Sequence, residues 1–450
     1  MPKFGKSRPE NKDEKDPVSK VNVIIEVSPR GGGPLRGTPT TLEEAGAQVS
    51  ARLMALGAHV HEESGTTVRV RPEGAPENAG GLRGRPVRSR ENLLFSAEMD
   101  TEQVQALEEE PGVEVWPDAE LRLTSLPAPT LTPDCTFTRA ATMEEVQALL
   151  GVQGVWDAGF RGQGIAVAIL DDGVHRPTYP VVGGMNLPHA DWGTGHLGSH
   201  GSMCAADVLV AAPNVKLLDY PIVAVDGTFQ ASAFLPIMHQ IIVRRQLEGL
   251  PHVLNASFSL TGVPPRTPDS RHPAWNAHHP MNRKIQEIVA AGVVVVFSAG
   301  NCGGPCADST CDLTTIGPGV SINGLNSLPE VITVAAVNAD GVRLGYSGQG
   351  PGVHALEKPD VAAFSHFHAH FGPGRPGGLG TDSGTSASAP LTAGVAALLL
   401  SANRSLRPDQ VKQALIRGAQ KASGPGWDAD LGYGVVNAGV SCQLVRQRLV

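Results

Sequence analysis

Hydroxyl side chains are concentrated near the carboxyl end of the chain, where one of them could be a nucleophile. The stretch TDSGTSASAPLTAG (381–394) contains Thr381, Ser383, Thr385, Ser386 and Ser388. Ser and Thr often cap a helix, but capping needs only one or two hydroxyls. The Gly and Ala residues between them would let a substrate backbone approach closely, and a helix N-terminus stabilises developing negative charge. A serine nucleophile also needs a base and an orienting carboxylate, which other parts of the chain must supply.

Apolar runs of strand length recur through the second part of the chain. They cover residues 164–170, 215–223, 252–259, 293–300 and 331–337. Continuous rather than alternating apolarity is typical of strands covered on both faces, as in a parallel sheet. Helical stretches such as 229–248 and 281–291 separate the runs, so we predict a three-layer α/β domain with a mainly parallel sheet. Functional groups in such sheets gather at the carboxyl ends of the strands.

Four polar residues lie where these predicted elements begin or end, and they could act together. They are Asp171, His200, Asn301 and Ser386. In acyl transfer a serine attacks a carbonyl, a histidine takes and returns the proton, and an aspartate orients the histidine. An amide side chain and a backbone N–H can donate to the oxyanion. The pattern therefore predicts Ser386 as nucleophile, His200 as base, Asp171 as orienting acid and Asn301 as oxyanion donor.

The motifs around these residues extend over residues 142–440, and in order they resemble the subtilisin-like serine proteases. The motifs are VWDAGFRGQGIAVAILDDG, SHGSMCAA, VLNASFS, FSAGN, KPDVAA and GTSASAPLTAGVAALLL. The order Asp, His, Ser is that of subtilisin. The resemblance implies a serine endopeptidase that hydrolyses polypeptides through an acyl-enzyme, with no cofactor and no metal. It also implies a substrate-binding set consisting of Ser257, Phe258, Ser259, Asp172 and Gly300.

The first part of the chain is expected to form a separate small domain. VNVIIEV, a helix beginning near Thr41, the weakly alternating stretch 57–70, ENLLFSAEM, a helix capped by Asp100 or Thr101, and PGVEVW give the order β-α-β-β-α-β. This order is that of an α+β ferredoxin-like domain. Residues 20–123 also resemble the inhibitory propeptide of many subtilisin-like proteases. That resemblance implies a zymogen whose own propeptide occupies the substrate cleft.

The remaining segments are predicted from composition. Residues 1–19 are charged and are expected to be disordered, 74–91 form a Gly/Pro/Arg loop, and 441–450 form a tail. Residues 124–141 have the composition of a linker, and we expect the activation cleavage between about 119 and 141.

Some local features resemble the kexin/furin branch of the family. These are the paired acids Asp171-Asp172, Cys204 four residues after His200, and GTSASAPL. The resemblance implies that Asp172 faces the cleft and favours a basic P2 residue, whereas a turn with Gly173 is the alternative. The sequence after NASFS is LTGVPPRTPD rather than the acidic loop of kexins, so the P1 preference stays open. The segment after His200 is too short for the calcium loop of bacterial subtilisins.

Two clusters could have chemistry of their own. Cys302, Cys306 and Cys311 could bind zinc with a fourth ligand, form a disulfide, or be loop cysteines. His366, His368 and His370 alternate, so a strand would place them on one face, where they could meet a metal or face solvent.

Composition limits the compartment and the partners. A net charge of −8 gives no reason to expect a nucleic-acid partner, and the apolar runs are too short to span a bilayer. The first twenty residues contain no apolar core of a signal peptide, and six cysteines do not make a disulfide scaffold, so a cytoplasmic location is expected. Two alternatives to a hydrolytic endopeptidase stay open at this point. One is a transpeptidase, in which an amine rather than water resolves the acyl-enzyme, and the other is a peptide-binding pseudoprotease without activity.

Overall fold

The computed structural model describes most of the chain. The described residues are 20–28, 42–61, 66–70, 90–124, 135, 139–186, 190–222, 228–372, 375–421 and 424–450. The predicted disordered lead 1–19 therefore lies outside the described residues, as do most of the loop 74–91 and most of the linker 124–141.

Seven parallel strands form the central sheet of the larger domain, in the order β16-β15-β14-β12-β8-β10-β9. The strands are β8 (Ala166–Asp171), β9 (Val181–Gly184), β10 (Lys216–Pro221), β12 (Val253–Ala256), β14 (Val294–Ser298), β15 (Ile332–Val337) and β16 (Val361–Phe364). Five of these strands fall within the predicted apolar runs. The α/β fold with a parallel sheet is confirmed.

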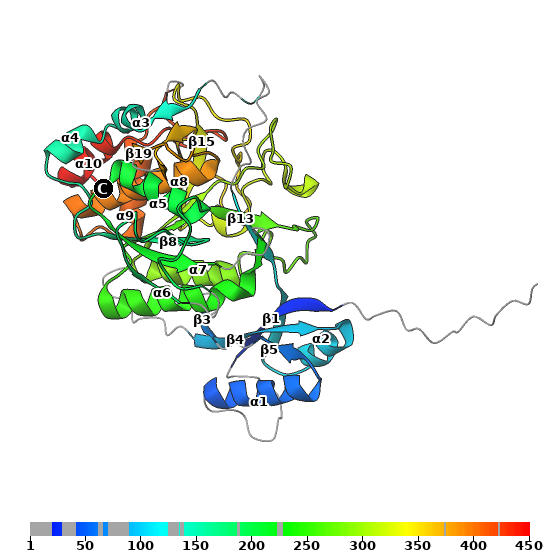
Figure 1. Cartoon of the computed structure of the whole chain (residues 1–450). Helices are drawn as coiled ribbons and strands as arrows, with labels where there is room; N and C mark the ends of the chain where they lie inside the picture. Colours follow the sequence, from blue (N-terminus) through cyan, green and yellow to red (C-terminus); the bar gives the residue numbers. More distant parts are fainter. Residues whose placement is uncertain are drawn as a thin grey trace, which may run out of the picture.

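Helices cover both faces of this sheet, because alternate residues of each strand are apolar on both sides. Val167 and Ile169 pack with α5 (His200–Ala211) and α8 (Thr385–Ala402). Ala168 and Leu170 face the other way and pack with α6 (Phe234–Glu248) and α7 (Pro280–Ala290). Figure 1 shows these layers above and below β8.

The other helices of this domain surround the first layer. They are α3 (Met143–Leu150), α4 (Gln153–Asp157), α9 (Pro408–Gly418) and α10 (Ala438–Arg446), with short β17 (Phe367–His368) beside β7 (Ala141–Thr142), and β18 (Phe371–Gly372) beside β19 (Arg375–Pro376). Among the described helices, α8 alone is long and apolar enough to cross a membrane, and 89% of it is buried inside the protein. It is a core helix of this domain.

The N-terminal domain is a second, antiparallel sheet with two helices. Its elements are β1 (Val21–Val27), α1 (Leu42–Ala55), β2 (His59–Val60), β3 (Thr66–Val70), β4 (Arg90–Met99), α2 (Thr101–Glu108) and β5 (Val113–Pro117). The sheet order is β2-β4-β1-β5, with β3 also paired to β4. Asp100 caps α2, and its carboxylate accepts from the backbone N–H of Gln103 as part of a capping box. The observed order is β-α-β-β-β-α-β, which has one strand more than predicted because the stretch 57–70 contains two short strands, β2 and β3.

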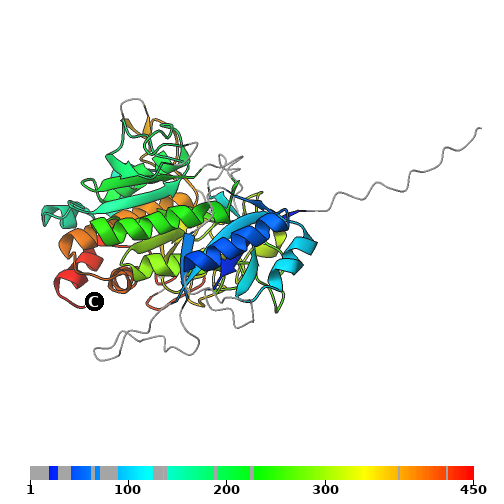
Figure 2. The ribbon, with the colours of Figure 1, turned by 90° about the horizontal axis from the view of Figure 1, so that it is seen from below.

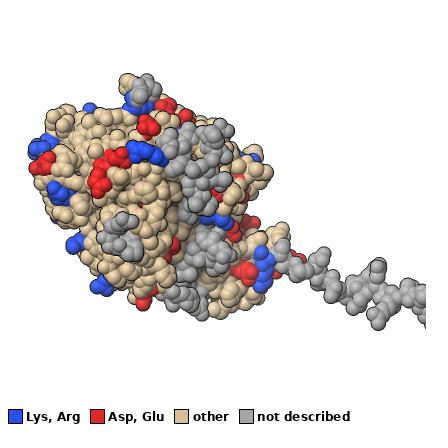
Figure 3. All heavy atoms as spheres, turned by 45° about the horizontal axis from the view of Figure 1, so that its top comes forward, with Lys and Arg blue, Asp and Glu red and all other residues tan. Residues whose placement is uncertain are grey.

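The N-terminal sheet lies between its own helices and the larger domain. In Figure 1, α1 lies below the N-terminal sheet, and α6 and α7 of the larger domain lie above it. Figure 2, seen from below, shows the blue N-terminal domain in front of part of the larger domain. On the face displayed in Figure 3, basic and acidic side chains are interspersed among uncharged ones. The chain leaves β5 through β6 (Glu120–Leu123), which enters the larger domain.

Candidate active site

Asp171 and His200 meet because β8 ends where α5 begins. Asp171 is the last residue of β8 and His200 the first of α5, whose N-cap is Ser199. The Nδ1 of His200 lies 2.8 Å from Oδ1 of Asp171, and both side chains are buried. A carboxylate at this nitrogen fixes the tautomer that leaves Nε2 free to accept a proton.

Ser386 lies in the first turn of α8, which starts after Gly384. Gly384 has φ +77°, and a Cβ there would lie 2.7 Å from the carbonyl oxygen of Thr124. A glycine is therefore required both by the backbone conformation and by the close approach of another chain segment. Two neighbouring hydroxyls have packing roles: that of Thr385 donates to Asn301, and that of Ser388 donates to the carbonyl of Phe364.

The Asn301 amide is oriented by two hydrogen bonds from Thr385. Its Oδ1 accepts from the backbone N–H of Thr385 at 3.0 Å and from the Thr385 hydroxyl at 2.9 Å. Because the oxygen is held in this way, Nδ2 points to the other side, where it donates to the carbonyl of Thr124 at 2.5 Å. The arrangement can donate a hydrogen bond to a carbonyl oxygen that acquires negative charge.

The segment that reaches this amide is β6, an extended strand from the N-terminal part of the chain. It pairs antiparallel with β11 (Thr228–Gln230) on one side and β13 (Phe258–Thr261) on the other. We call the channel between β11 and β13 the cleft. At its end the backbone N–H of Thr124 donates to the carbonyl of Ser257 at 3.0 Å. The sequence pattern placed Thr124 only as the first residue of the predicted linker 124–141, eight residues after the last predicted strand.

The Thr124 side chain forms a hydrogen bond with the predicted nucleophile, the hydroxyl of Ser386. Oγ of Ser386 lies 2.6 Å from Oγ1 of Thr124, which donates to the carbonyl of Ser257 at 2.9 Å. A hydroxyl has a single hydrogen, so the Ser386 hydroxyl must be the donor in the first contact. Within the described part of the chain, Nε2 of His200 has no hydrogen-bond partner.

The carboxylates around His200 raise its pKa. Burial lowers the pKa of His200, but the charge and hydrogen bond of Asp171, together with the charge of Asp172, raise it above its ordinary value.

Cys204 lies next to these residues. Its Sγ is 3.6 Å from Oδ2 of Asp171 and 3.6 Å from the carbonyl oxygen of Ser386. Burial, then the Asp171 charge, raises the pKa of the Cys204 thiol well above its usual range, so it stays protonated.

Asp172 has a structural role that the sequence did not predict. Its Oδ1 accepts from the backbone N–H of Gly201 at 2.7 Å, and Oδ2 accepts from that of His200 at 3.1 Å. A carboxylate at the first N–H groups of a helix satisfies unpaired donors and complements the helix dipole. Both oxygens thus cap α5, and the expected preference for a basic P2 residue stays a prediction. Burial, then the Asp171 charge, raises the pKa of Asp172 to about 6.

The remaining predicted substrate-binding residues lie along the strand in the cleft. Phe258 pairs with Leu123, and Ser259 pairs with Arg122. The hydroxyl of Ser257 donates to the carbonyl of Ser386 at 3.3 Å. Gly300 faces Ser259, since a Cβ on Gly300 would lie 3.8 Å from its side chain. Ser257, Phe258, Ser259 and Gly300 therefore all lie close to residues 122–124.

The cysteine cluster forms disulfides. Cys302 is bonded to Cys311, and Cys306 is bonded to Cys135, which is distant in sequence. Of the three possibilities left open, the structure therefore selects the disulfide for all three thiols. Disulfides are typical of oxidising compartments, and the expected cytoplasmic location stays a prediction.

The three alternating histidines do not converge. Nε2 of His366 contacts the hydroxyl of Tyr346 at 3.1 Å, Nδ1 of His368 the carbonyl of Gly380 at 2.8 Å, and Nε2 of His370 the carbonyl of Leu197 at 2.6 Å. Within the described ranges, the group of side chains close enough to hold a metal is Asp171, His200 and Cys204, and it includes none of these histidines. The backbone of His366 has φ +62°, which breaks the strand alternation assumed in the prediction.

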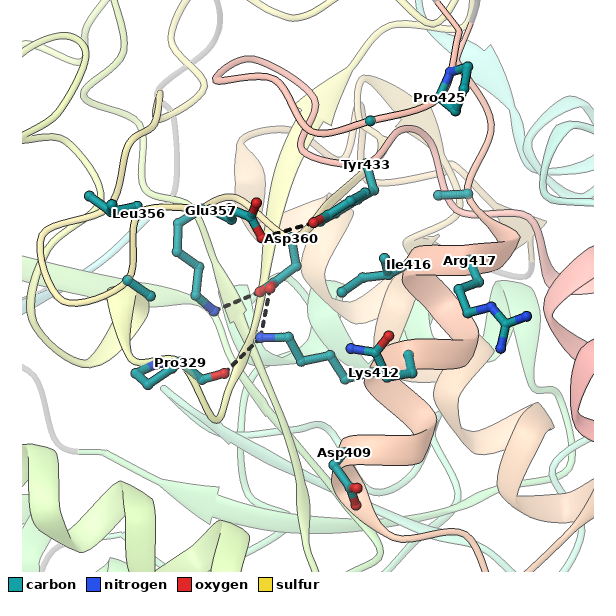
Figure 4. Close-up of a pocket in the computed structure, with 15 residues that line it drawn as sticks. Pro329, Leu356, Glu357, Asp360, Asp409, Lys412, Ile416, Arg417, Pro425 and Tyr433 are labelled. Atoms are coloured by element: carbon teal, nitrogen blue, oxygen red, sulfur yellow. Dashed lines mark hydrogen bonds and ion pairs between the residues drawn. The ribbon is translucent and has the colours of Figure 1, made fainter. Parts of the chain in front are cut away.

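A pocket of about 980 Å³ lies away from the candidate site, between α9 and the loop before β16. Figure 4 shows its side chains, with Asp360 bridging two lysines. Nζ of Lys358 lies 2.6 Å and Nζ of Lys412 2.7 Å from the Asp360 carboxylate. The pocket contains none of the four predicted catalytic residues, and Lys358, Asp360 and Lys412 are paired with each other.

Residues 162–434 match the family described as the subtilase family, peptidase S8. The chain belongs to the subtilase family. It is 29% identical over 316 residues to "Serine protease AprX" of Bacillus subtilis (strain 168), which covers 62% of this chain and 66% of AprX. It is 30% identical over 309 residues to "Mycosin-4" of Mycobacterium tuberculosis, which covers 62% of this chain and 64% of that protein. The chain thus spans less than two thirds of either relative.

Two further comparisons place the subtilase among known folds. It is 29% identical over 308 residues to Subtilisin DY of Bacillus licheniformis, covering 66% of this chain and 97% of that protein. The crystal structure of fervidolysin from Fervidobacterium pennivorans, a keratinolytic enzyme related to subtilisin, aligns over 95% of this chain and 61% of its own, with a TM-score of 0.59 and 20% identity. That alignment shows a shared fold.

Proposed function

We propose that this subtilase is a serine endopeptidase made as a zymogen, in which residues 120–124 occupy the cleft until they are cut. The observation that carries the proposal is the position of Thr124, whose carbonyl accepts from Asn301 while its side chain contacts Ser386. An extended segment added to cleft strands is a common mode of peptide recognition. The scissile bond is then the one that follows Thr124, inside the predicted interval of 119–141.

In the proposed reaction Oγ of Ser386 attacks the carbonyl carbon of the residue before the scissile bond, and its proton moves to Nε2 of His200. Asp171 holds the Nδ1 proton and stabilises the imidazolium. The oxyanion accepts from Nδ2 of Asn301 and from the backbone N–H of Ser386. The amine leaves with the proton from His200, and water then hydrolyses the acyl-enzyme with His200 again acting as base.

The contact between the two domains supports an inhibitory role for the N-terminal domain. Glu26 of β1 is 4% exposed and forms an ion pair with Arg283 of α7, and it also accepts from Asn92 at 2.7 Å and from the indole N–H of Trp116 at 3.1 Å. A buried carboxylate with this many donors is held in one geometry. The ring of Trp116 packs edge-on against His279, 5.6 Å between centroids.

A second part of the contact lies where the chain turns into the cleft. Nε2 of His279 donates to the carbonyl of Pro117 at 3.0 Å, and the carboxylate of Asp118 accepts from the hydroxyl and backbone N–H of Ser232. Arg271 donates to Glu108 at 2.7 Å and to the carbonyl of Val115 at 2.8 Å. These contacts anchor β5 and β6 on the larger domain, so a segment cut after Thr124 would stay bound as an inhibitor.

The function is tested with the processed enzyme, freed of its N-terminal domain. A fluorophosphonate probe should label Ser386, identified by peptide mass spectrometry, and a peptide ending Glu-Leu-Arg-Leu-Thr before its scissile bond should be cut after Thr. Product masses with a free-amine peptide present distinguish hydrolysis from ligation. Absence of both labelling and cleavage would leave a peptide-binding protein, and ligation as the main product would identify a transpeptidase.

The substitution Asp172→Asn should move the acid limb of the pH profile to lower pH. Since His200 must be neutral to act as base, activity is lost as the pH falls through its pKa. The Asp172 charge contributes to raising that pKa, so its removal lowers the pKa and retains more activity in acid. The measurement is kcat/KM against pH for both proteins.

The matched control is Asp409→Asn, which removes one carboxylate from an exposed position on α9. It should leave the acid limb in place. An acid limb that is identical in wild type and Asp172→Asn would limit Asp172 to capping α5, with an effect on thermal stability alone.

A further inference from the structure

Ser259 and Gly300 face each other beside Thr124. A Cβ placed on Gly300 would lie 3.8 Å from both Cβ and Oγ of Ser259, an ordinary van der Waals distance, so the glycine leaves room there for about one methyl group. With Thr124 in place, the pocket bordered by Thr124, Ser259 and Asn301 has about 20 Å³ of free space, room for about one water molecule. Little space therefore remains beside the Thr124 side chain.

The disulfide Cys302–Cys311 limits how far this site can widen. Cys302 directly follows Asn301, and both cysteines border the same pocket. Since the loop between them is tied at both ends, an enlargement would have to come from Ser259 rather than from this loop.

The same site has hydrogen-bonding groups placed for one hydroxyl. Oγ1 of Thr124 donates to the carbonyl of Ser257 at 2.9 Å and lies 3.1 Å from Oγ of Ser298, at the end of β14. Ser298 is fully buried. A side chain without a hydroxyl would leave the Ser298 hydroxyl without this partner in a buried place, which costs binding.

Two carboxylates border the pocket as well, but each already accepts hydrogen bonds. Asp308 accepts from the backbone N–H and hydroxyl of Thr310, and Asp312 accepts from the backbone N–H of Val263. The residue that lines this pocket with a positive charge is Arg122, two residues before Thr124. The positively charged residue at this pocket is thus the third before the scissile bond rather than the first.

We infer that the S1 site of this protease is a small polar niche, made by Ser259, Ser298 and the carbonyl of Ser257, which selects threonine as the P1 residue. Large and basic P1 side chains are excluded because only about 20 Å³ of free space remains beside Thr124. Leu121, fully buried with Phe229 and Phe258, marks an apolar site at P4. The substrate class is therefore peptides with a leucine at P4 and a threonine at P1. The inference rests on the proposed endopeptidase activity.

The test uses five fluorogenic peptides Glu-Leu-Arg-Leu-X, with X as Thr, Val, Ala, Phe or Arg, and the processed enzyme. Threonine and valine have the same shape, so their ratio isolates the hydroxyl. We expect kcat/KM for Thr to exceed that for Val about tenfold, and those for Phe and Arg about 100-fold or more. Ser298→Ala should bring the Thr/Val ratio near one.

Size selection is tested with Ser259→Gly, which should raise the Phe/Thr ratio about tenfold or more. The matched control Ser259→Ala keeps the Cβ and should keep the exclusion of Phe. Cleavage of Phe or Arg peptides as fast as Thr peptides overturns the inference while the protease activity stands. Equal Thr and Val rates overturn the role of Ser298, and Ser386 labelling without cleavage of any peptide overturns the inference. Loss of both labelling and cleavage overturns the proposed function itself.

Discussion

Ser386→Ala should remain a single full-length chain, whereas the wild type should separate after Thr124. In the proposed reaction Ser386 Oγ is the atom that forms the acyl bond, and it lies 2.6 Å from Oγ1 of Thr124. Removal of this nucleophile costs about 10⁶-fold in kcat, a magnitude established for subtilisin. Intact mass measures the processing, and turnover of the Glu-Leu-Arg-Leu-Thr peptide measures the activity.

The matched control is Ser388→Ala, which removes a hydroxyl from the same buried helix. Its hydrogen bond goes to Phe364 rather than to the cleft, so the variant should be processed at the same position as the wild type. If Ser386→Ala is processed after Thr124 during expression, another protease makes the cut and the self-processing part of the proposal fails. A wild type whose new N-terminus is not Ser125 would place another residue in the P1 position.

Asn301→Ala should lower kcat about 100- to 1000-fold with little change in KM, because the amide donates mainly to charge that develops in the transition state. The 2.5 Å contact with the Thr124 carbonyl is the geometry on which this rests. The loss should appear in single-turnover acylation of a peptide substrate. Thermal unfolding of the same sample checks that the variant is folded.

A second variant separates the oxyanion role from a structural one. Asn301→Asp keeps the oxygen that accepts from Thr385 but has no N–H to donate, so the contact at the start of α8 stays while the donor is lost. It should therefore lose as much turnover as Asn301→Ala. Unchanged turnover in either variant would remove Asn301 from the mechanism.

The sequence determined the elements and the chemical residue types, because those depend on neighbours along the chain. Continuous apolar runs predicted β8, β10, β12, β14 and β15, since a strand covered on both faces needs no polar side. The capping of α2 by Asp100 was also a local pattern. The positions after these elements then located the Asp, His, Asn and Ser of the candidate site.

Other features were decided by the tertiary structure. They depend on residues that are distant in the sequence and meet only after folding, so no local pattern could predict them. Cys135 and Cys306 are separated by 171 positions in the sequence, so their pairing has no local signal. The capping of α5 by Asp172 had no local signal either, because it depends on the packing of α5 against the end of β8, which places two unpaired N–H groups beside the carboxylate. Alternation along a strand failed for His366 because the backbone there is left-handed.

The cleft itself is the clearest case. Thr124 belongs to a stretch that composition marks as the edge of a linker, whereas Ser259 lies in β13 and Gly300 follows β14. Only when β6 pairs between β11 and β13 does Thr124 meet Ser386 and Asn301, with Ser259 beside it. The sequence by itself determined which reaction this chain has the residues for. The tertiary structure determined which peptide segment those residues hold, since strand pairing and side-chain volume are long-range properties.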